Sequence, residues 1–253
     1  MQQSNYERPN NKDRNEETKL RVSSIYVVQE GTTEELRSSL TSARSIYDSM
    51  VNVKVGPQAV RFEVHRGLLC YQSAYFNSCL NSTFKEAREK AVTLDDEDPK
   101  IFKRFFTWLY TGKLLYDEET VEKVPYGELL RSYIFAEKRL APRFQNACID
   151  AVILRDKVFQ QLPNTEETQR VWDNVCDSSP MRRLLVDLLV LLGDMPKIIH
   201  EDSKIDFSAD FLASIIRGLY VLKGSGPLSR QDLDFWGKRC SYHTHEDGSS
   251  ECV

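Results

Sequence analysis

The sequence contains few glycines and none of the short motifs that many enzymes use to bind phosphates, cofactors or metals. Only 11 of its 253 residues are glycine. The patterns G-x-x-x-x-G-K-[ST], G-x-G-x-x-G, G-x-S-x-G and H-E-x-x-H do not occur. An enzyme would have to assemble its site from scattered residues of the C-terminal half, with Asp173, Asp187 and His200 as loose candidates. We therefore predict a protein that is not an enzyme.

Long apolar runs and cysteines are also scarce. The longest apolar run, Leu184–Leu192, is interrupted by Asp187 and is much shorter than the roughly 20 residues of a membrane span. Six cysteines are too few for a disulfide scaffold of this length. The N-terminal residues lack the apolar segment of a signal peptide. These features predict a protein of the cytoplasm and/or nucleus that does not bind membranes.

The chain has no excess of positive charge. Lys and Arg number 34 against 38 Asp and Glu, which gives a net charge of −4. A protein that binds nucleic acid mainly through its phosphates concentrates basic residues on one face, so this balance argues against nucleic acid as the main ligand. The apolar share of 41% and the charged share of 28% are those of an ordinary soluble protein. Proteins are the expected partners.

Changes in polarity and hydrophobic period divide the chain into five parts. The first part is too polar to bury a core and is predicted to be a disordered tail. An amphipathic helix or linker follows, then a mixed α/β part, a mainly helical part, and a polar tail that contains Cys and His. The predicted ranges are 1–24, 25–48, 49–155, 156–239 and 240–253.

The mixed part begins with two runs in which every second residue is apolar. Residues 51–55 alternate Val with polar residues, 56–58 (Gly-Pro-Gln) supply a turn, and 60–64 alternate again. Period-2 runs about a short turn predict a β-hairpin with one buried face. Residues 91–94 are a further short strand candidate.

Helical patterns dominate after the hairpin. Asp98 and Pro99 form a helix start, and Gly112 ends the apolar pattern that follows. Later helices are predicted at 166–176, 180–193, 208–222 and 228–238. Early strands followed by helices indicate an α+β fold, in contrast to the alternating order of α/β proteins.

Several separated motifs in this part resemble the BTB/POZ domain. In chain order they are 62–69 (FEVHRGLL), 73–76 (SAYF), 84–86 (FKE), 94–95 (LD), 98–102 (DPKIF) and 108–112 (WLYTG). The resemblance covers roughly 49–155. It implies a protein–protein interaction module, often a homodimer, which in many relatives is a substrate adaptor of a cullin-type ubiquitin ligase or a transcription-related partner-binding domain. The helical remainder and the Cys/His tail are similar to fungal proteins that place a BTB domain ahead of a helical region.

The resemblance assigns candidate partner-binding residues. In cullin-binding relatives a hydrophobic-x-Glu step precedes the third strand, and Phe84-Lys85-Glu86 matches it. Phe84 would then fill an apolar pocket of a cullin scaffold, and Glu86 would support the loop. The alternative is that Phe84 covers the edge of this protein's own core and Glu86 is solvated. Phe102, at the start of the helix up to Tyr110, is expected to add to the same exposed face.

Two further positions carry over from the family. His65 matches a structural histidine at the junction of strand and helix. Arg66 matches a basic position in the groove by which some members recruit corepressors, but Met50 stands where that groove needs an acid, and Asp48 is two residues away. Because the expected acid is missing, the sequence does not match the corepressor-binding groove, and Arg66 is predicted to be a surface charge.

The C-terminal tail concentrates possible metal ligands. Cys240, His243, His245 and Cys252 form a C-x2-H-x-H-x6-C pattern. Zinc prefers four tetrahedral Cys or His ligands, so a structural zinc ion could fasten this tail, as part of a transcription-related partner-binding protein. The alternative is a disordered end with incidental Cys and His. The acidic run 95–98 lacks the glycine turn of a calcium loop and is better explained as a helix start.

Overall fold

The computed structural model describes residues 47, 49–83, 85–116, 123–193, 207–222 and 234–245. The polar tail 1–24, all but Tyr47 of the predicted helix or linker 25–48, and Phe84, His200 and Cys252 lie outside the described residues.

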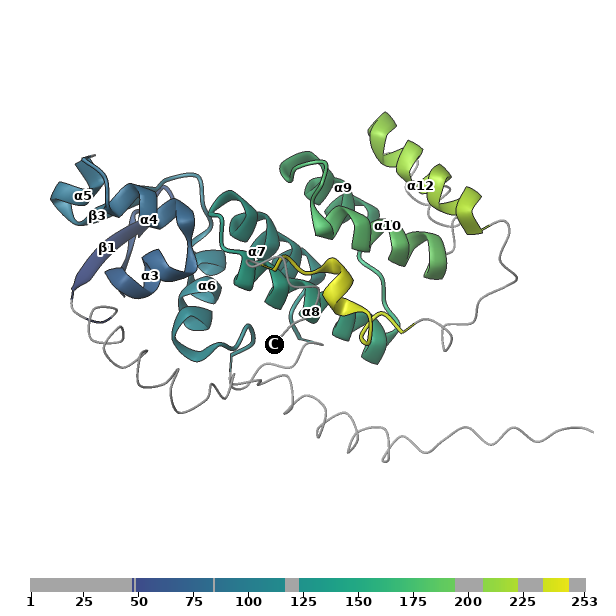
Figure 1. Ribbon diagram of the computed structural model, residues 1–253, viewed down its shortest axis with the longest axis horizontal. Helices are drawn as coiled ribbons and strands as arrows, with labels where there is room; N and C mark the ends of the chain where they lie inside the picture. Colours follow the sequence, from purple (N-terminus) through teal and green to yellow (C-terminus); the bar gives the residue numbers. More distant parts are fainter. Residues whose placement is uncertain are drawn as a thin grey trace, which may run out of the picture.

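A three-stranded sheet lies at one end of the molecule (Figure 1). Strands β1 (Met50–Val55) and β2 (Val60–His65) form the predicted hairpin, and β3 (Ala91–Leu94) pairs with β1 in parallel. Val53 sits opposite Phe62 on one side and Val92 on the other. The valines of β1 are fully buried, whereas Asn52 is exposed, so alternation places one face of the sheet on the core.

The elements that follow are mainly helices, and this confirms the α+β class. The helices that pack with the sheet and continue from it are α3 (Arg66–Gln72), α4 (Ala74–Leu80), α5 (Lys85–Glu89), α6 (Pro99–Thr111), α7 (Tyr126–Lys138) and α8 (Pro142–Phe159). The more distant elements are α9 (Thr165–Asn174), α10 (Pro180–Leu192), α12 (Ala209–Leu222) and the 3₁₀ turn η2 (Arg239–Tyr242).

Local sequence explains most of the helix ends. Asp98 caps α6 by accepting a hydrogen bond from the backbone N–H of Lys100 at 2.8 Å, and Pro99 occupies the first turn. Gly112 ends α6 in the left-handed conformation. The predicted helix 228–238 is wrong at its described end, because residues 235–238 form a turn in which Asp234 accepts from the N–H of Gly237 at 2.8 Å.

One hydrophobic core joins the sheet to the helical region. Phe105 of α6 is fully buried among aromatic rings, with Phe135 of α7 at 5.2 Å and Phe144 of α8 at 5.1 Å between ring centroids. The same core continues to Met181 and Leu184 of α10. The BTB-like part and the first helices after it are therefore stabilised together.

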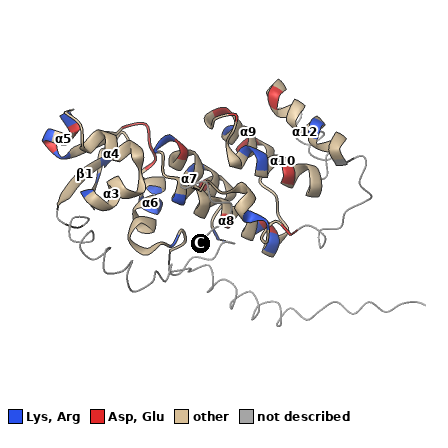
Figure 2. Cartoon of the chain, viewed as in Figure 1, with Lys and Arg blue, Asp and Glu red and all other residues tan. Residues whose placement is uncertain are grey.

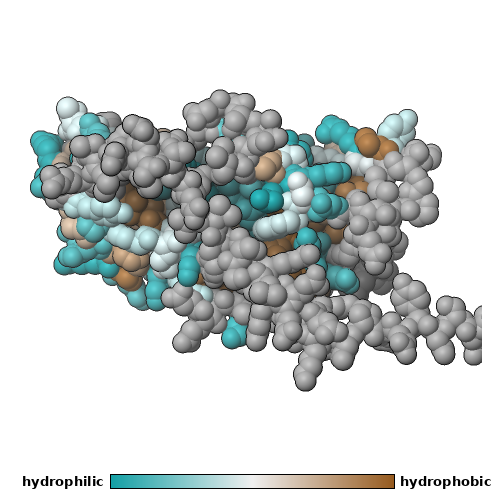
Figure 3. Space-filling model, turned by 60° about the horizontal axis from the view of Figure 1, so that its bottom comes forward, coloured by the Kyte–Doolittle hydropathy of each residue, from teal (hydrophilic) through white to brown (hydrophobic). Residues whose placement is uncertain are grey.

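The far end of the helical region is covered less completely. Trp172 of α9 and Leu189 of α10 form a second, smaller core with Phe211 and Ile215 of α12. Several large apolar side chains of α12 remain exposed, and apolar surface is visible at this end of the molecule (Figure 3). None of the helices within the described ranges has the length and apolar character needed to cross a membrane.

Two glycines hold positions that other residues adopt at a cost. Gly56 follows β1 with φ +72°, donates to the carbonyl of Leu94 at 2.9 Å, and would bring an added Cβ to 3.1 Å from the Glu97 carbonyl oxygen. Gly112 also has a positive φ, +67°, but a Cβ added there would have no neighbouring atom within 4 Å.

We expect Gly112→Ala to lower the free energy of unfolding by ~1–2 kcal/mol, which is the cost of a left-handed conformation. Gly56→Ala should lower it further, because the added Cβ is also crowded. Urea unfolding of both variants checks this order, and equal losses would contradict the crowding at Gly56.

Candidate protein-interaction surface

The predicted cullin-contact segment lies on a short surface helix beside the sheet. Phe84 is outside the described residues, and α5 begins directly after it, where the sequence predicted only a loop. No residue of α5 is buried, and Lys85 and Glu89 face solvent as an ion pair at 3.7 Å. Glu86 is half-buried. The helix is thus held at the surface at the end of the molecule farthest from α12 (Figure 1).

A polar and aromatic cluster adjoins this helix, which we call the Tyr75–Arg139 cluster. It consists of Tyr75, Glu86, Glu97 and Arg139. The Arg139 guanidinium donates to Glu97 Oε1 at 2.7 Å and lies over the Tyr75 ring at 4.6 Å. Burial raises the pKa of the Tyr75 hydroxyl, Arg139 opposes that rise, and the charge of Glu86 adds to it. The negative charge of Glu86 thus disfavours the ionised form of Tyr75.

The cluster joins elements that are distant in the chain. Ser73 caps α4 by accepting from the N–H of Phe76 at 3.2 Å, and its hydroxyl donates to the Arg139 carbonyl at the end of α7. The N–H of Ala74 donates to the Leu140 carbonyl at 3.2 Å. The surface next to α5 is therefore fixed by α4 and α7, and a partner would meet a preformed shape.

Phe102 is not part of this surface. Its side chain is fully buried, with the ring centroids of Phe62 at 4.8 Å and of Phe135 at 6.0 Å. The prediction that it lies on an exposed face is wrong, because β2 and α7 cover the side of α6 that carries it. Tyr110, at the other end of the same helix, is exposed.

Arg66, for which the sequence predicted a surface charge, is half-buried and is engaged within the molecule. Its guanidinium donates to the Leu80 carbonyl at 3.1 Å and to the side chain of Asn81. It thereby satisfies an end carbonyl of α4, which the sequence signal did not reveal. Met50 is exposed, and Asp48 lies outside the described residues.

His65 occupies the junction of β2 and α3. The hydroxyl of Tyr110 accepts from its backbone N–H at 3.0 Å and lies 2.8 Å from its Nδ1. The ring of Tyr47 packs edge-on against the imidazole at 5.0 Å. This histidine ties the sheet to the end of α6, which is a structural role.

The carboxylates that were loose candidates for an enzyme site have structural partners. Asp173 accepts from the Gln169 amide at 2.7 Å, one turn away on α9. Asp187 of α10 accepts from the Tyr242 hydroxyl at 2.7 Å. In the acidic run 95–98, Asp98 caps α6 and Glu97 pairs with Arg139, so the run serves helix capping and the Tyr75–Arg139 cluster. Figure 2 shows both charge signs distributed over the described elements.

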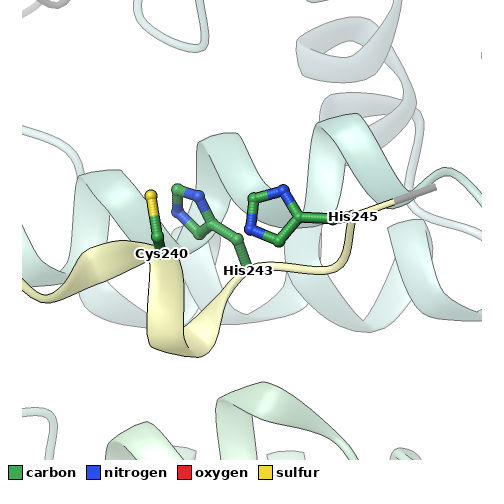
Figure 4. A group of neighbouring side chains, drawn as sticks. All are labelled: Cys240, His243 and His245. Atoms are coloured by element: carbon green, nitrogen blue, oxygen red, sulfur yellow. The ribbon is translucent and has the colours of Figure 1, made fainter. Parts of the chain in front are cut away.

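Three of the four predicted metal ligands come together at the C-terminal end of the described chain. The candidate ligand atoms of Cys240, His243 and His245 all lie within 4.8 Å of one another, and Figure 4 shows the two rings and the thiol gathered on one side of the segment. Cys252 lies outside the described residues.

Residues 41–128 match the family model of the BTB/POZ domain. The chain therefore contains a BTB/POZ domain, a module that binds other proteins.

Several known proteins resemble a part of the chain. It is 32% identical over 74 residues to Kelch-like ECH-associated protein 1A of Danio rerio, which covers 29% of this chain and 12% of that protein. It is 26% identical over 78 residues to Kelch-like protein 40 of Xenopus tropicalis, with 31% and 13% covered. Kelch repeat and BTB domain-containing protein 4 of Homo sapiens is 26% identical over 73 residues, with 29% and 14% covered. The chain spans only 12–14% of the length of these relatives, and the similarity to fungal proteins stays a prediction.

Proposed function

We propose that this protein is a non-enzymatic substrate adaptor that binds a cullin-type ubiquitin ligase scaffold through its BTB/POZ domain, in the cytoplasm or nucleus. The observation that carries the proposal is the position of Glu86. It lies on a surface helix directly after Phe84, in the hydrophobic-x-Glu step that cullin-binding relatives use.

The surroundings of Glu86 support this role. The helix α5 packs against α4 and β3, and Tyr75 of α4 in turn packs against Arg139, so Glu86 lies beside a well-packed part of the domain. A polar rim next to an aromatic side chain is typical of the surfaces on which binding energy concentrates. Phe84 precedes this rim in the sequence, and we assign it the apolar contact.

The corepressor-recruiting alternative has less support. That groove needs a free basic residue and an acid at the first strand. The Arg66 guanidinium already donates to the end of α4, and Met50 takes the place of the acid. The family resemblance also implies a homodimer, which would present two adaptor surfaces.

The proposal is tested by measuring the Kd of the purified full chain for a purified cullin scaffold. We expect Phe84→Ala and Glu86→Ala each to raise Kd at least tenfold, equivalent to about 1.4 kcal/mol, because each removes a contact near the centre of the interface. Lys85→Ala is the matched control, since Lys85 lies between them and is solvent-exposed. It should change Kd by less than about twofold.

Two results would refute the adaptor role. One is the absence of binding by the wild-type chain at about 100 µM, a concentration at which even weak specific complexes form. The other is an equal loss in all three variants, which would point to general unfolding of α5. Thermal unfolding shows whether each variant is folded. Sedimentation of the wild type with the scaffold gives the stoichiometry of the complex, which is needed to interpret Kd.

A further inference from the structure

The C-terminal segment 239–245 is docked across two helices of the preceding region (Figure 1). The Tyr242 hydroxyl donates to Asp187 of α10 at 2.7 Å. The side-chain amide of Asn146 on α8 donates to the Thr244 carbonyl at 3.0 Å and accepts from the Thr244 N–H at 2.9 Å. The segment is thus held by specific polar contacts to both helices and by the Tyr242 ring, which is buried in the main core.

The docked segment presents three side chains of the types that zinc prefers. Cys240 lies in η2, and His243 and His245 follow on extended chain, with their candidate ligand atoms within 4.8 Å of one another (Figure 4). Tetrahedral ligands at about 2.0–2.3 Å from zinc are about 3.3–3.8 Å apart. The candidate ligand atoms therefore lie within about 1–1.5 Å of the separations in a zinc site.

The surroundings of His243 favour metal binding over a lone surface histidine. Its Nε2 lies 3.0 Å from Asp150 Oδ1 of α8, and only 3% of its side chain is exposed. Histidines that bind metals commonly donate their other ring N–H to a carboxylate, which fixes the tautomer and the ring orientation. With Nε2 donating to Asp150, Nδ1 is the nitrogen that carries the lone pair.

The same carboxylate is balanced by a cation. Arg239 Nε lies 3.7 Å from Asp150 Oδ1. Asp150 therefore sits between a guanidinium and an imidazole and is suited to orient His243. It comes from a helix 93 residues earlier in the chain, so the tail's spacing alone gives no hint of it.

We propose that Cys240, His243 and His245 bind a structural zinc ion that fastens the C-terminal segment to α8 and α10, with Asp150 positioning His243. These side chains supply three of the four ligands that a tetrahedral zinc ion takes. The ion fastens segment 239–245 to the core, and its role is independent of any binding at α5.

The test is the zinc content of the full chain, purified with a tag that contains no histidine and measured by mass spectrometry of the metal. We expect about one zinc ion per chain, and less than about a fifth of that in Cys240→Ser and His245→Ala. Cys176→Ser is the matched control, because Cys176 is an exposed thiol outside the cluster, and it should keep the wild-type zinc content.

A chelator titration tests the positioning role of Asp150. Asp150→Asn should keep the ligands but bind zinc about 10–100-fold more weakly, the usual effect of losing such a carboxylate. Circular dichroism of each variant establishes that the helices remain. Substoichiometric zinc in the wild type, or zinc that persists in both Cys240→Ser and His245→Ala, would overturn the proposal.

Discussion

Glu128→Leu is expected to lower the free energy of unfolding by ~3–5 kcal/mol, because it leaves a buried arginine without its counter-charge. Arg104 of α6 is fully buried, and its Nε donates to Glu128 Oε1 of α7 at 2.9 Å. Arg104 Nη2 also donates to Glu128 Oε1, and Nη1 donates to the Leu114 carbonyl at 2.8 Å. Lys100 Nζ lies 2.6 Å from Glu128 Oε2. Equilibrium unfolding in urea gives the loss directly.

The control for this pair is the double variant Arg104→Met with Glu128→Leu. Removing both charges avoids the unpaired guanidinium, so we expect at least half of the lost stability to return. Glu63→Leu, at an exposed position of the outer sheet face, should stay within about 0.5 kcal/mol of the wild type. A double variant as unstable as Glu128→Leu would show that the pair itself is not the cause.

The same pair gives the protein a defined response to acid. Desolvation raises the pKa of Glu128, but hydrogen bonds and charges from Lys100 and Arg104 outweigh it and hold the pKa below its ordinary value of 4.5. The stability that the carboxylate contributes is present above about pH 4.5 and is lost as the pH falls through the lowered pKa. The difference in free energy of unfolding between the wild type and the double variant should therefore shrink as the pH falls through that range.

Phe102→Ala is expected to lower the free energy of unfolding by ~3–5 kcal/mol, the usual cost of emptying a buried aromatic site. Its ring is fully buried between Phe62 and Phe135. Phe106, on the same helix, is half-buried, so Phe106→Ala should cost less than half as much. Guanidinium unfolding compares the two variants.

This prediction separates a core role from a partner contact. If Phe102→Ala weakens partner binding, we expect the loss to follow the fraction of unfolded protein and to disappear under conditions where the variant is folded. A variant that folds as stably as the wild type but fails to bind would restore Phe102 to the interaction surface.

Local patterns were sufficient for the secondary structure around the sheet. Alternating valines predicted β1 and β2, because a half-buried strand repeats every two residues. Asp98 and Gly112 predicted the ends of α6, because capping depends on neighbours in the chain. The short helix α5 was missed, since five residues carry too little periodic signal to distinguish a helix from a loop.

Burial on α6 could not be predicted in the same way. Its apolar residues surround more than one face, so the pattern identified a wide apolar helix but not which side chains reach solvent. Phe102 became a core residue because β2 and α7 cover it, whereas Tyr110 remains exposed. The burial of Arg104 is less expected still, because a charged residue inside an apolar pattern normally lies at the surface.

The sequence by itself determined the α+β class, the β1–β2 hairpin, several helix ends, the BTB/POZ resemblance, and the spacing of Cys240, His243 and His245. These features depend on residues close together in the chain or on motifs in a fixed order. The tertiary structure decided that Arg104 meets Glu128, that Arg66 binds the end of α4, and that Asp150 lies beside His243. Each of these contacts joins different secondary-structure elements. It forms only when those elements pack together, so a local sequence pattern cannot predict it.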